Sequence, residues 1–283
     1  MAGMVSRTSG PGIDLGSVQK TLLLPLWGRA IESRKPKPLL FDETAVKIVD
    51  AIGYDFSTIA HNIGRITQLA WVVRCLHGDR IIREFLQNHP GGTIVNLGCG
   101  LDTTLERIDN GRLRWYDLDL PDVIELKQRF VPENPRRNMI ACSLLDERWM
   151  TEVKTSGATL LIAMGVFYYL REPEMRQTFI GLANSFPGCE VYFDACSAFG
   201  LKVANKKVIQ EGGMDGSAIL RWSLGNAKQL ETWDPRLEIL AAYPMFHGAR
   251  CGLSMKEKWG TFLSDRLRVM SMIHLRLGEA RAE

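Results

Sequence analysis

The 283-residue sequence lacks any apolar run of the roughly eighteen residues that a membrane-spanning helix needs, and its first twenty residues contain no hydrophobic signal region. It also has little net charge, +3 at pH 7, and its basic residues are scattered, which argues against a nucleic-acid partner. The six cysteines show neither a C-x-x-C pair nor a zinc-binding spacing. We therefore expect reduced thiols, no metal, no membrane partner and a cytoplasmic location.

Hydrophobic patterning divides the chain into three parts. Residues 1–16 are rich in Gly, Ser and Pro and predict a disordered tail, whereas residues 17–90 show the apolar spacing of helices and predict an N-terminal helical layer. Residues 91–283 alternate apolar runs with helical segments, which indicates one α/β domain. The expected strands are 92–97, 113–118, 137–142, 158–164, 189–195, 237–246 and 270–277, with crossover helices at 122–130 and 173–186. The glycine-rich residues 197–233 break this alternation and predict an inserted cap.

One strand and the turn after it carry most of the functional information. The apolar run at residues 93–97 ends in Gly98 and Gly100, and a second apolar run ends about twenty positions later in Asp119, the spacing of a nucleoside-binding β-α-β unit. Glycines let the main chain lie directly against a ligand, and a carboxylate at the end of the next strand can accept both hydroxyl protons of a ribose. The pattern predicts an adenosine-containing cofactor.

The residue at the position of a third glycine distinguishes a dinucleotide from other adenosine-containing cofactors. A dinucleotide-binding turn has Gly-x-Gly-x-x-Gly because a pyrophosphate presses on the start of the helix. Here the third glycine is replaced by Thr103, and the preceding Asp102 would repel a phosphate. This disfavours an NAD-dependent oxidoreductase and favours S-adenosylmethionine, which has no phosphate.

The same motif resembles a known family. Val-Asn-Leu-Gly-Cys-Gly-Leu-Asp-Thr-Thr at residues 95–104 and Tyr-Asp-Leu-Asp-Leu-Pro at 116–121 are similar to the cofactor motif of the leucine carboxyl methyltransferases, especially their bacterial polyketide O-methyltransferase branch. Residues 21–34, 109–112, 145–149 and 186–188 also fit that branch. The resemblance implies a class I methyltransferase fold, with a doubly wound, mostly parallel sheet, that binds S-adenosylmethionine.

The resemblance also assigns cofactor contacts. It places Gly98 and Gly100 against the methionine and ribose of the cofactor, Asp119 on the ribose hydroxyls, and Arg74 on the cofactor carboxylate. The resemblance also assigns two residues to the adenine and offers two weaker candidates for a basic residue that closes the site. They are Ser143 and Leu144, which flank the adenine, and Arg29 and Arg34, either of which closes the site from the N-terminal helix.

Met164 is where the sequence departs from the family. The family has an acidic residue after the alanine that ends the fourth strand, whereas this chain reads Ala163-Met164-Gly165. The substitution removes an anion near the positive charges of the cofactor. This change keeps open the alternative of a cofactor-binding or interaction protein that has lost turnover.

The reaction itself demands little of the protein beyond alignment and exclusion of water, because the sulfonium is a good leaving group. An ionised carboxylic acid needs no base, whereas a phenol needs one. The candidate bases are His61, His247 and Asp194, and the candidate substrate wall consists of Tyr168, Tyr169 and Trp222.

We therefore expect an S-adenosylmethionine-dependent O-methyltransferase acting on a small-molecule carboxylic acid or phenol in specialised metabolism. The alternative within the same fold is methylation of a protein C-terminal carboxylate. The sequence indicates neither the identity of the substrate nor an oligomeric state.

Overall fold

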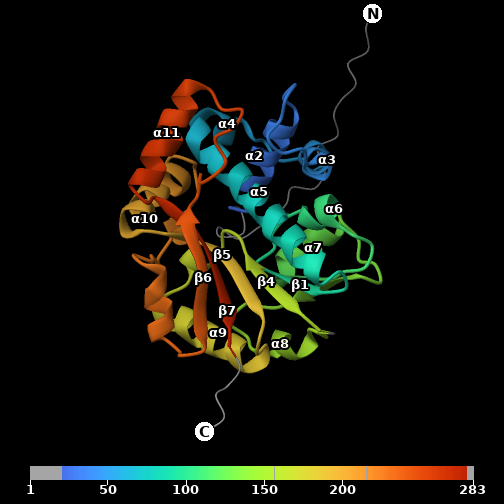
Figure 1. The fold of residues 1–283 in the computed structure, drawn as a ribbon. Coiled ribbons are helices and arrows are strands. Elements are labelled where there is room, and N and C mark those ends of the chain that lie inside the picture. Colours follow the sequence, from blue (N-terminus) through green and yellow to red (C-terminus); the bar gives the residue numbers. More distant parts are fainter. Residues whose placement is uncertain (1–20, 156, 215, 279–283) are drawn as a thin grey trace, which may run out of the picture.

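The computed structural model describes residues 21–155, 157–214 and 216–278, and seven strands in this part of the chain form one mixed sheet (Figure 1). The sheet has the order β3-β2-β1-β4-β5-β7-β6, in which β1 to β5 are parallel and β7 is antiparallel to both β5 and β6. All seven predicted strands are present with small shifts at their ends. Their bounds are β1 Thr93–Leu97, β2 Arg114–Asp119, β3 Arg137–Ala141, β4 Thr159–Ala163, β5 Glu190–Cys196, β6 Leu237–Pro244 and β7 Met270–Leu277.

The strand order explains where a ligand can bind. The chain leaves β1 toward β2 on one side and returns through β4 on the other, so the connections diverge between these two neighbours. Ligands of open α/β sheets bind at such a point, outside the carboxyl ends of the strands. Both β1 and β4 are buried along their whole length, as expected for central parallel strands covered on both faces.

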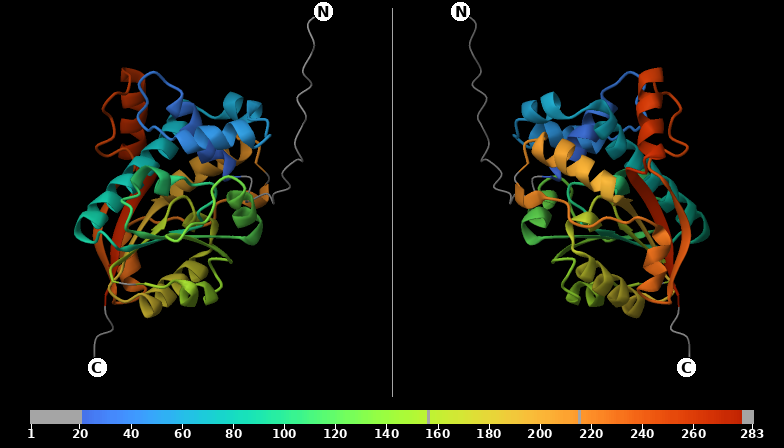
Figure 2. Two further views of the ribbon diagram at one scale, coloured as in Figure 1. Left: turned by 90° about the vertical axis from the view of Figure 1, so that its right-hand side faces the viewer. Right: turned by 90° about the vertical axis from the view of Figure 1, so that its left-hand side faces the viewer.

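Helices cover both faces of the sheet (Figure 2). The long helix α5 packs with α6 against one face, whereas α8 and α9 pack against the other around Trp149 and Phe179. The helices before and between the strands are α2 Leu23–Ser33, α3 Glu43–Ala51, α4 Ser57–Asn62, α5 Arg65–Asn88, α6 Thr104–Ile108, α7 Pro121–Gln128, α8 Arg148–Glu152, α9 Glu172–Ser185, α10 Ala198–Ala204 and α11 Met255–Arg266. No helix among the described residues is long and apolar enough to cross a membrane.

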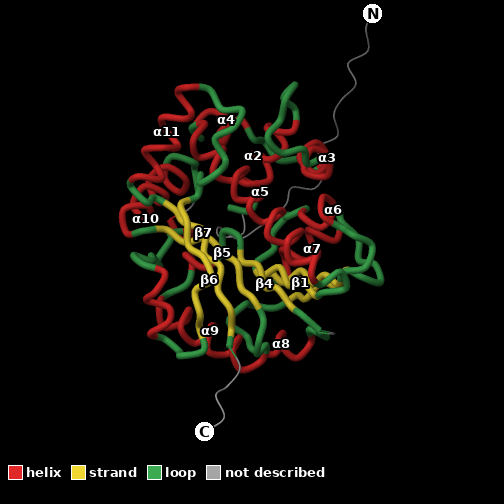
Figure 3. The backbone as a smooth tube through the Cα atoms, in the orientation of Figure 1, coloured by secondary structure: helices red, strands yellow, loops and turns green. Residues whose placement is uncertain are grey.

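The segment expected to be an inserted cap divides into two structural parts (Figure 3). Helix α10 continues into a π-helical turn at Asn205–Gln210, and both lie near the carboxyl ends of the strands. The later part of the segment, with 3-10 turns at Gly216–Ala218 and Ala227–Thr232, supplies Trp222 and Leu230 to the apolar core on the α9 side of the sheet. The predicted tail at residues 1–16 lies outside the described residues.

A buried ionic cluster joins the first half of the sheet to its helices. Lys127 of α7 is completely buried, and its Nζ lies 2.9 Å from Oδ1 of Asp117 in β2. Nε of Arg137 in β3 lies 3.4 Å from the other oxygen of Asp117, and the same guanidinium donates to Glu106 of α6. Burial opposes the charge on Lys127, but Asp117 together with Cys99 and Asp102 raises the pKa of Lys127 above its ordinary value.

Removing one partner of this cluster should be costly. In Lys127→Met, Asp117 keeps its charge in a dry site with Arg137 as its main counter-ion, so the free energy of unfolding should fall by about 3 to 5 kcal/mol. Urea denaturation measures the change. The double variant Lys127→Met/Asp117→Asn should lose less than the sum of the two single variants, because they share one interaction. Additive losses would contradict the proposed coupling.

Candidate functional site

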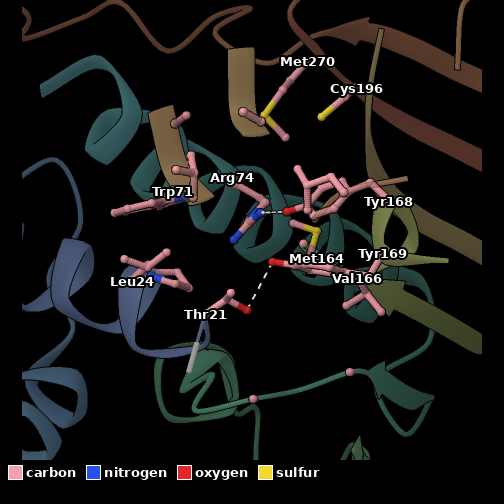
Figure 4. A pocket seen from close by; sticks show the side chains of 18 of the residues that line it. Thr21, Leu24, Trp71, Arg74, Met164, Val166, Tyr168, Tyr169, Cys196 and Met270 are labelled. Carbon is pink, nitrogen blue, oxygen red and sulfur yellow. Dashed lines mark hydrogen bonds between the residues drawn. The ribbon is translucent and has the colours of Figure 1, made fainter. Parts of the chain in front are cut away.

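A cavity of about 580 Å³ lies at the carboxyl ends of β1 and β4. Its floor consists of the turns that follow the parallel strands, and its walls come from α2, α5, α10 and α11 (Figure 4). Nine of the predicted contact residues lie on its wall, namely Arg74, Gly98, Gly100, Asp119, Ser143, Leu144, Met164, Tyr168 and Tyr169. The site therefore brings together residues that are widely separated in the sequence.

The turn after β1 requires its two glycines. Gly98 and Gly100 have φ of +62° and +48°, backbone angles that are strained for residues with a Cβ. A Cβ on Gly98 would also lie 2.6 Å from Cγ2 of Val166. The two glycines thereby let the side chains of Val166 and Leu22 pack directly against the main chain of this turn at the cavity wall.

Asp119 is held in place at the end of β2. Its Oδ2 accepts a hydrogen bond of 2.7 Å from the amide of Gly100, and its Oδ1 accepts one of 2.8 Å from the amide of Leu120. Burial raises the pKa of Asp119, while these two hydrogen bonds act in the opposite direction. Each oxygen keeps a second lone pair, so the fixed carboxylate can still accept hydroxyl protons from a ligand in the cavity.

Arg74 supplies a fixed positive charge from α5. Its Nη1 donates to the hydroxyl of Tyr168 at 3.1 Å and to Oδ2 of Asp194 at 3.2 Å, whereas its buried Nε has no hydrogen-bond partner. Burial opposes the charge, but Asp194 and the neighbouring Tyr168 and Cys75 together raise the pKa of Arg74 above its ordinary value. Arg74 lines the cavity, so its charged guanidinium fits an anionic group of a ligand, such as the carboxylate of an amino acid.

Two tyrosines form the wall opposite α2. Tyr168 points toward Arg74, and the hydroxyl of Tyr169 donates to Thr21 at 3.1 Å (Figure 4). Burial raises the pKa of both tyrosines, which keeps them protonated at neutral pH. They can orient a ligand by hydrogen bonding and packing, but they do not act as bases.

The two weaker basic candidates differ in position. Arg29 lines the cavity, but its Nε donates to Asp42 at 2.9 Å and its Nη2 donates to the carbonyl of Leu101 at 2.8 Å. These bonds hold α2 against the turn after β1. Arg34 is exposed and pairs with Asp50, and it is not among the residues lining the cavity. Of the two, Arg29 is placed to close the site.

None of the three candidate bases is among the residues that line the cavity. His61 and His247 are exposed, and neither lines the cavity. Asp194 is fully buried, with one oxygen bound to Arg74 and the other accepting a 2.6 Å hydrogen bond from the amide of Gly165. Asp194 therefore positions Arg74 and the turn after β4.

Trp222, predicted for the substrate wall, is not among the residues that line the cavity. It is buried in the core on the α9 side of the sheet, where its ring lies 6.0 Å from that of Trp233. A tryptophan in a glycine-rich segment offers the same apolar surface to a core or to a ligand, so the sequence did not distinguish the two.

Sequence reasoning also missed the apolar chamber that extends the cavity beyond the glycine turn. Its wall comes largely from the last third of the chain and consists of Phe199, Leu220, Met245, Phe246, Leu263, Leu267 and Met270, together with Trp71 and Leu24 from the N-terminal helices. The apolar spacing of residues 255–267 was a usable signal, because it is helical and lies between two predicted strands.

The fold and this site define a class I methyltransferase that uses S-adenosylmethionine. A protein of the duf574 family from Streptomyces avermitilis shares the fold, with a TM-score of 0.55 and 12% identity over 88% of this chain and 96% of that one. The leucine carboxyl methyltransferase model matches residues 23–183, and the chain belongs to this family.

Two relatives agree with this assignment. The tetracenomycin polyketide synthesis O-methyltransferase TcmP of Streptomyces glaucescens is 33% identical over 238 residues, which cover 83% of this chain and 86% of that protein. The S-adenosyl-L-methionine-dependent methyltransferase dpfgK of Gibberella zeae is 28% identical over 257 residues, covering 81% of this chain and 85% of that protein. The chain is thus a methyltransferase and not an NAD-dependent oxidoreductase.

Asp119 should contribute strongly to cofactor binding. Asp119→Ala removes a charged hydrogen-bond acceptor from the cavity wall and should weaken binding of S-adenosylhomocysteine by about 1.5 to 3 kcal/mol, as measured by calorimetric titration. Asp122→Ala removes the same charge three residues later and does not touch the cavity, so it serves as the matched control. Equal affinities for the Asp119 variant and the wild type would refute the assigned role.

The variant Met164→Glu tests the effect of the missing family acid on cofactor binding. Met164 lines the cavity and is only partly buried, so the carboxylate in Met164→Glu would face a site that binds a positively charged cofactor. We expect S-adenosylmethionine to bind more tightly by about 1 kcal/mol at an effective dielectric near 20. Thermal melts with and without cofactor measure this as a larger ligand-induced shift.

Met164→Gln is the control, because it has the shape of the glutamate without its charge. A lower melting temperature in Met164→Glu with no larger ligand-induced shift would show instead that position 164 belongs to the apolar core, where an unpaired carboxylate costs several kcal/mol, roughly.

Proposed function

We propose that this methyltransferase transfers the methyl group to a carboxylate oxygen of an apolar small molecule. S-adenosylmethionine supplies the methyl group and a neutral thioether leaving group. Gly98, Gly100 and Asp119 would hold the nucleoside part of the cofactor, and Arg74 would hold its carboxylate. The match to the O-methyltransferase TcmP supports oxygen as the acceptor atom.

The choice of a carboxylate as acceptor depends on one observation. The side chains around the cavity that could act as a general base are protonated or already hydrogen-bonded. No histidine among the described residues lines the cavity, both tyrosines are kept protonated by burial, and Asp194 is bound on both oxygens. The other two carboxylates on the wall, Asp102 and Asp119, lie in the turn after β1 and at the end of β2, where the nucleoside part of the cofactor would bind. A substrate that needs deprotonation would therefore find no free base at the acceptor end of the cavity. A carboxylic acid arrives ionised at neutral pH, whereas a phenol with a pKa near about 10 does not.

The shape and lining of the cavity support an apolar substrate body. The chamber formed by Phe199, Leu220, Leu263, Leu267 and Met270 belongs to the same cavity as the turn after β4, so it offers an apolar surface next to the methyl-transfer end. Lys207 is the basic residue at this side of the wall, and it is already paired with Glu211. A mostly apolar cavity of about 580 Å³ fits a fused-ring or alkyl-aromatic acid better than the C-terminus of a folded protein.

The specialised-metabolism role and the cytoplasmic location remain parts of this proposal. All six cysteines are free thiols, which agrees with a reducing compartment.

The dependence of the rate on pH tests the choice of acceptor. For an aromatic carboxylic acid, kcat/KM should stay flat from about pH 6 to pH 9, because the substrate is already ionised and no protein base has to lose a proton. For a phenol on the same ring scaffold, kcat/KM should rise about tenfold per pH unit, as the phenolate fraction does. Mass spectrometry identifies methyl ester and methyl ether products. A bell-shaped profile with the acid, or faster turnover of the phenol at neutral pH, would contradict the proposal.

A further inference from the structure

Helix α11 presents an exposed apolar face. Its large apolar side chains recur at helical spacing, so they lie on one side of the helix. They are Met255, Trp259, Phe262, Leu263 and Leu267, with exposures of 71%, 67%, 50%, 55% and 47%. The rings of Trp259 and Phe262 contact each other edge to face, with centroids 5.9 Å apart. A cluster of exposed apolar residues of this kind is typical of a surface that binds a partner.

The charges around this apolar face have one sign. Lys256, Lys258 and Arg266 of α11 and Arg268, two residues after its end, are exposed, and none of them forms an ion pair within the described part of the chain. The two acidic residues of the helix are already neutralised, because Glu257 pairs with Arg65 and Asp265 pairs with Arg250. The surface is therefore apolar at its centre and basic at its edges.

This charge pattern selects the kind of partner. A second copy docking through a two-fold axis would place the same patch on both sides, so that like charges would meet. A partner that is both apolar and acidic avoids this conflict. Helix α11 also stands at a corner of the molecule, away from the β1–β3 side of the sheet (Figures 1 and 2), where it can contact an extended surface.

The apolar face continues into the cavity. Leu263 and Leu267 belong both to the exposed face and to the chamber wall, and Gly260 and Ser264 of the same helix also line the chamber. Phe199 of α10, 49% exposed, lies on the chamber wall as well. One side of α11 thus faces solvent and the adjoining side faces the chamber, so a surface bound by α11 lies next to the route into the site.

We propose that α11 seats the protein on an anionic lipid surface. Tryptophan, phenylalanine and leucine enter the boundary between headgroups and acyl chains, while the flanking lysines and arginines attract acidic headgroups. Such contact needs no membrane-spanning helix, and it revises the expectation of a protein without a membrane partner. Lipid binding does not depend on the proposed substrate, so it can be tested without turnover.

Vesicle cosedimentation tests the proposal directly. The wild-type protein should bind vesicles of phosphatidylcholine and phosphatidylglycerol, bind pure phosphatidylcholine much less, and lose binding as salt rises. The variant Trp259→Ala/Phe262→Ala changes residues outside the cavity wall and should abolish binding while keeping the affinity for S-adenosylhomocysteine. Lys256→Gln should weaken binding about fivefold. Phe41→Ala is the matched control, because Phe41 is 64% exposed and lies before α3.

Other results would overturn the proposal. Absence of vesicle binding by the folded wild type would do so, and acidic proteins would then be the alternative class of partner. Equal binding to both kinds of vesicle would exclude the role of the basic residues. A wild-type dimer in light scattering that Trp259→Ala/Phe262→Ala converts to a monomer would identify a second copy as the occupant. Loss of binding in Phe41→Ala as well would show that the effect is not specific to α11.

Discussion

The buried pair of Arg74 and Asp194 joins the three parts of the structure that the site needs. Arg74 belongs to the N-terminal helical layer, Asp194 to β5, and the second oxygen of Asp194 accepts from the amide of Gly165 after β4. A Cβ at Gly165 would lie 2.6 Å from the guanidinium, so this backbone passes directly beneath the charge. Two opposite charges removed from water are costly unless they remain paired. The pair thereby fixes the helical layer over the ends of β4 and β5. The cavity lies between this layer and the strand ends.

The sheet and the nucleoside end of the site could be predicted from sequence because local signals determine them. A buried parallel strand is a short apolar run, and the turn after β1 needs glycine at Gly98, where φ is positive. The roles of His61, His247 and Asp194 could not be predicted, because the type of a residue does not indicate whether it faces a cavity, solvent or a counter-ion. The position of Trp222 could not be predicted for the same reason, because its burial depends on Trp233 and the α9 face of the sheet.

The acceptor end of the site was harder to predict than the cofactor end. Its wall is assembled from α10, α11 and the segments flanking β6 and β7, none of which carries a motif. Phe199, Leu263 and Leu267 line one cavity only after the antiparallel pair β6 and β7 has joined the edge of the sheet. Such long-range proximity leaves no spacing pattern in the sequence, whereas Gly98, Gly100 and Asp119 occupy one contiguous β-α-β unit.

The position of α11 in the chain has an evolutionary consequence. It lies in the connection between β6 and β7, two antiparallel neighbours at one edge of the sheet. A connection between such strands can change in length and composition without altering the register of β1, β2 and β4, because surface connections tolerate insertion better than the elements they join. Descendants of one ancestral cofactor domain can therefore exchange residues 245–269 to acquire a new acceptor pocket and a new outer surface together, while the methyl donor remains the same.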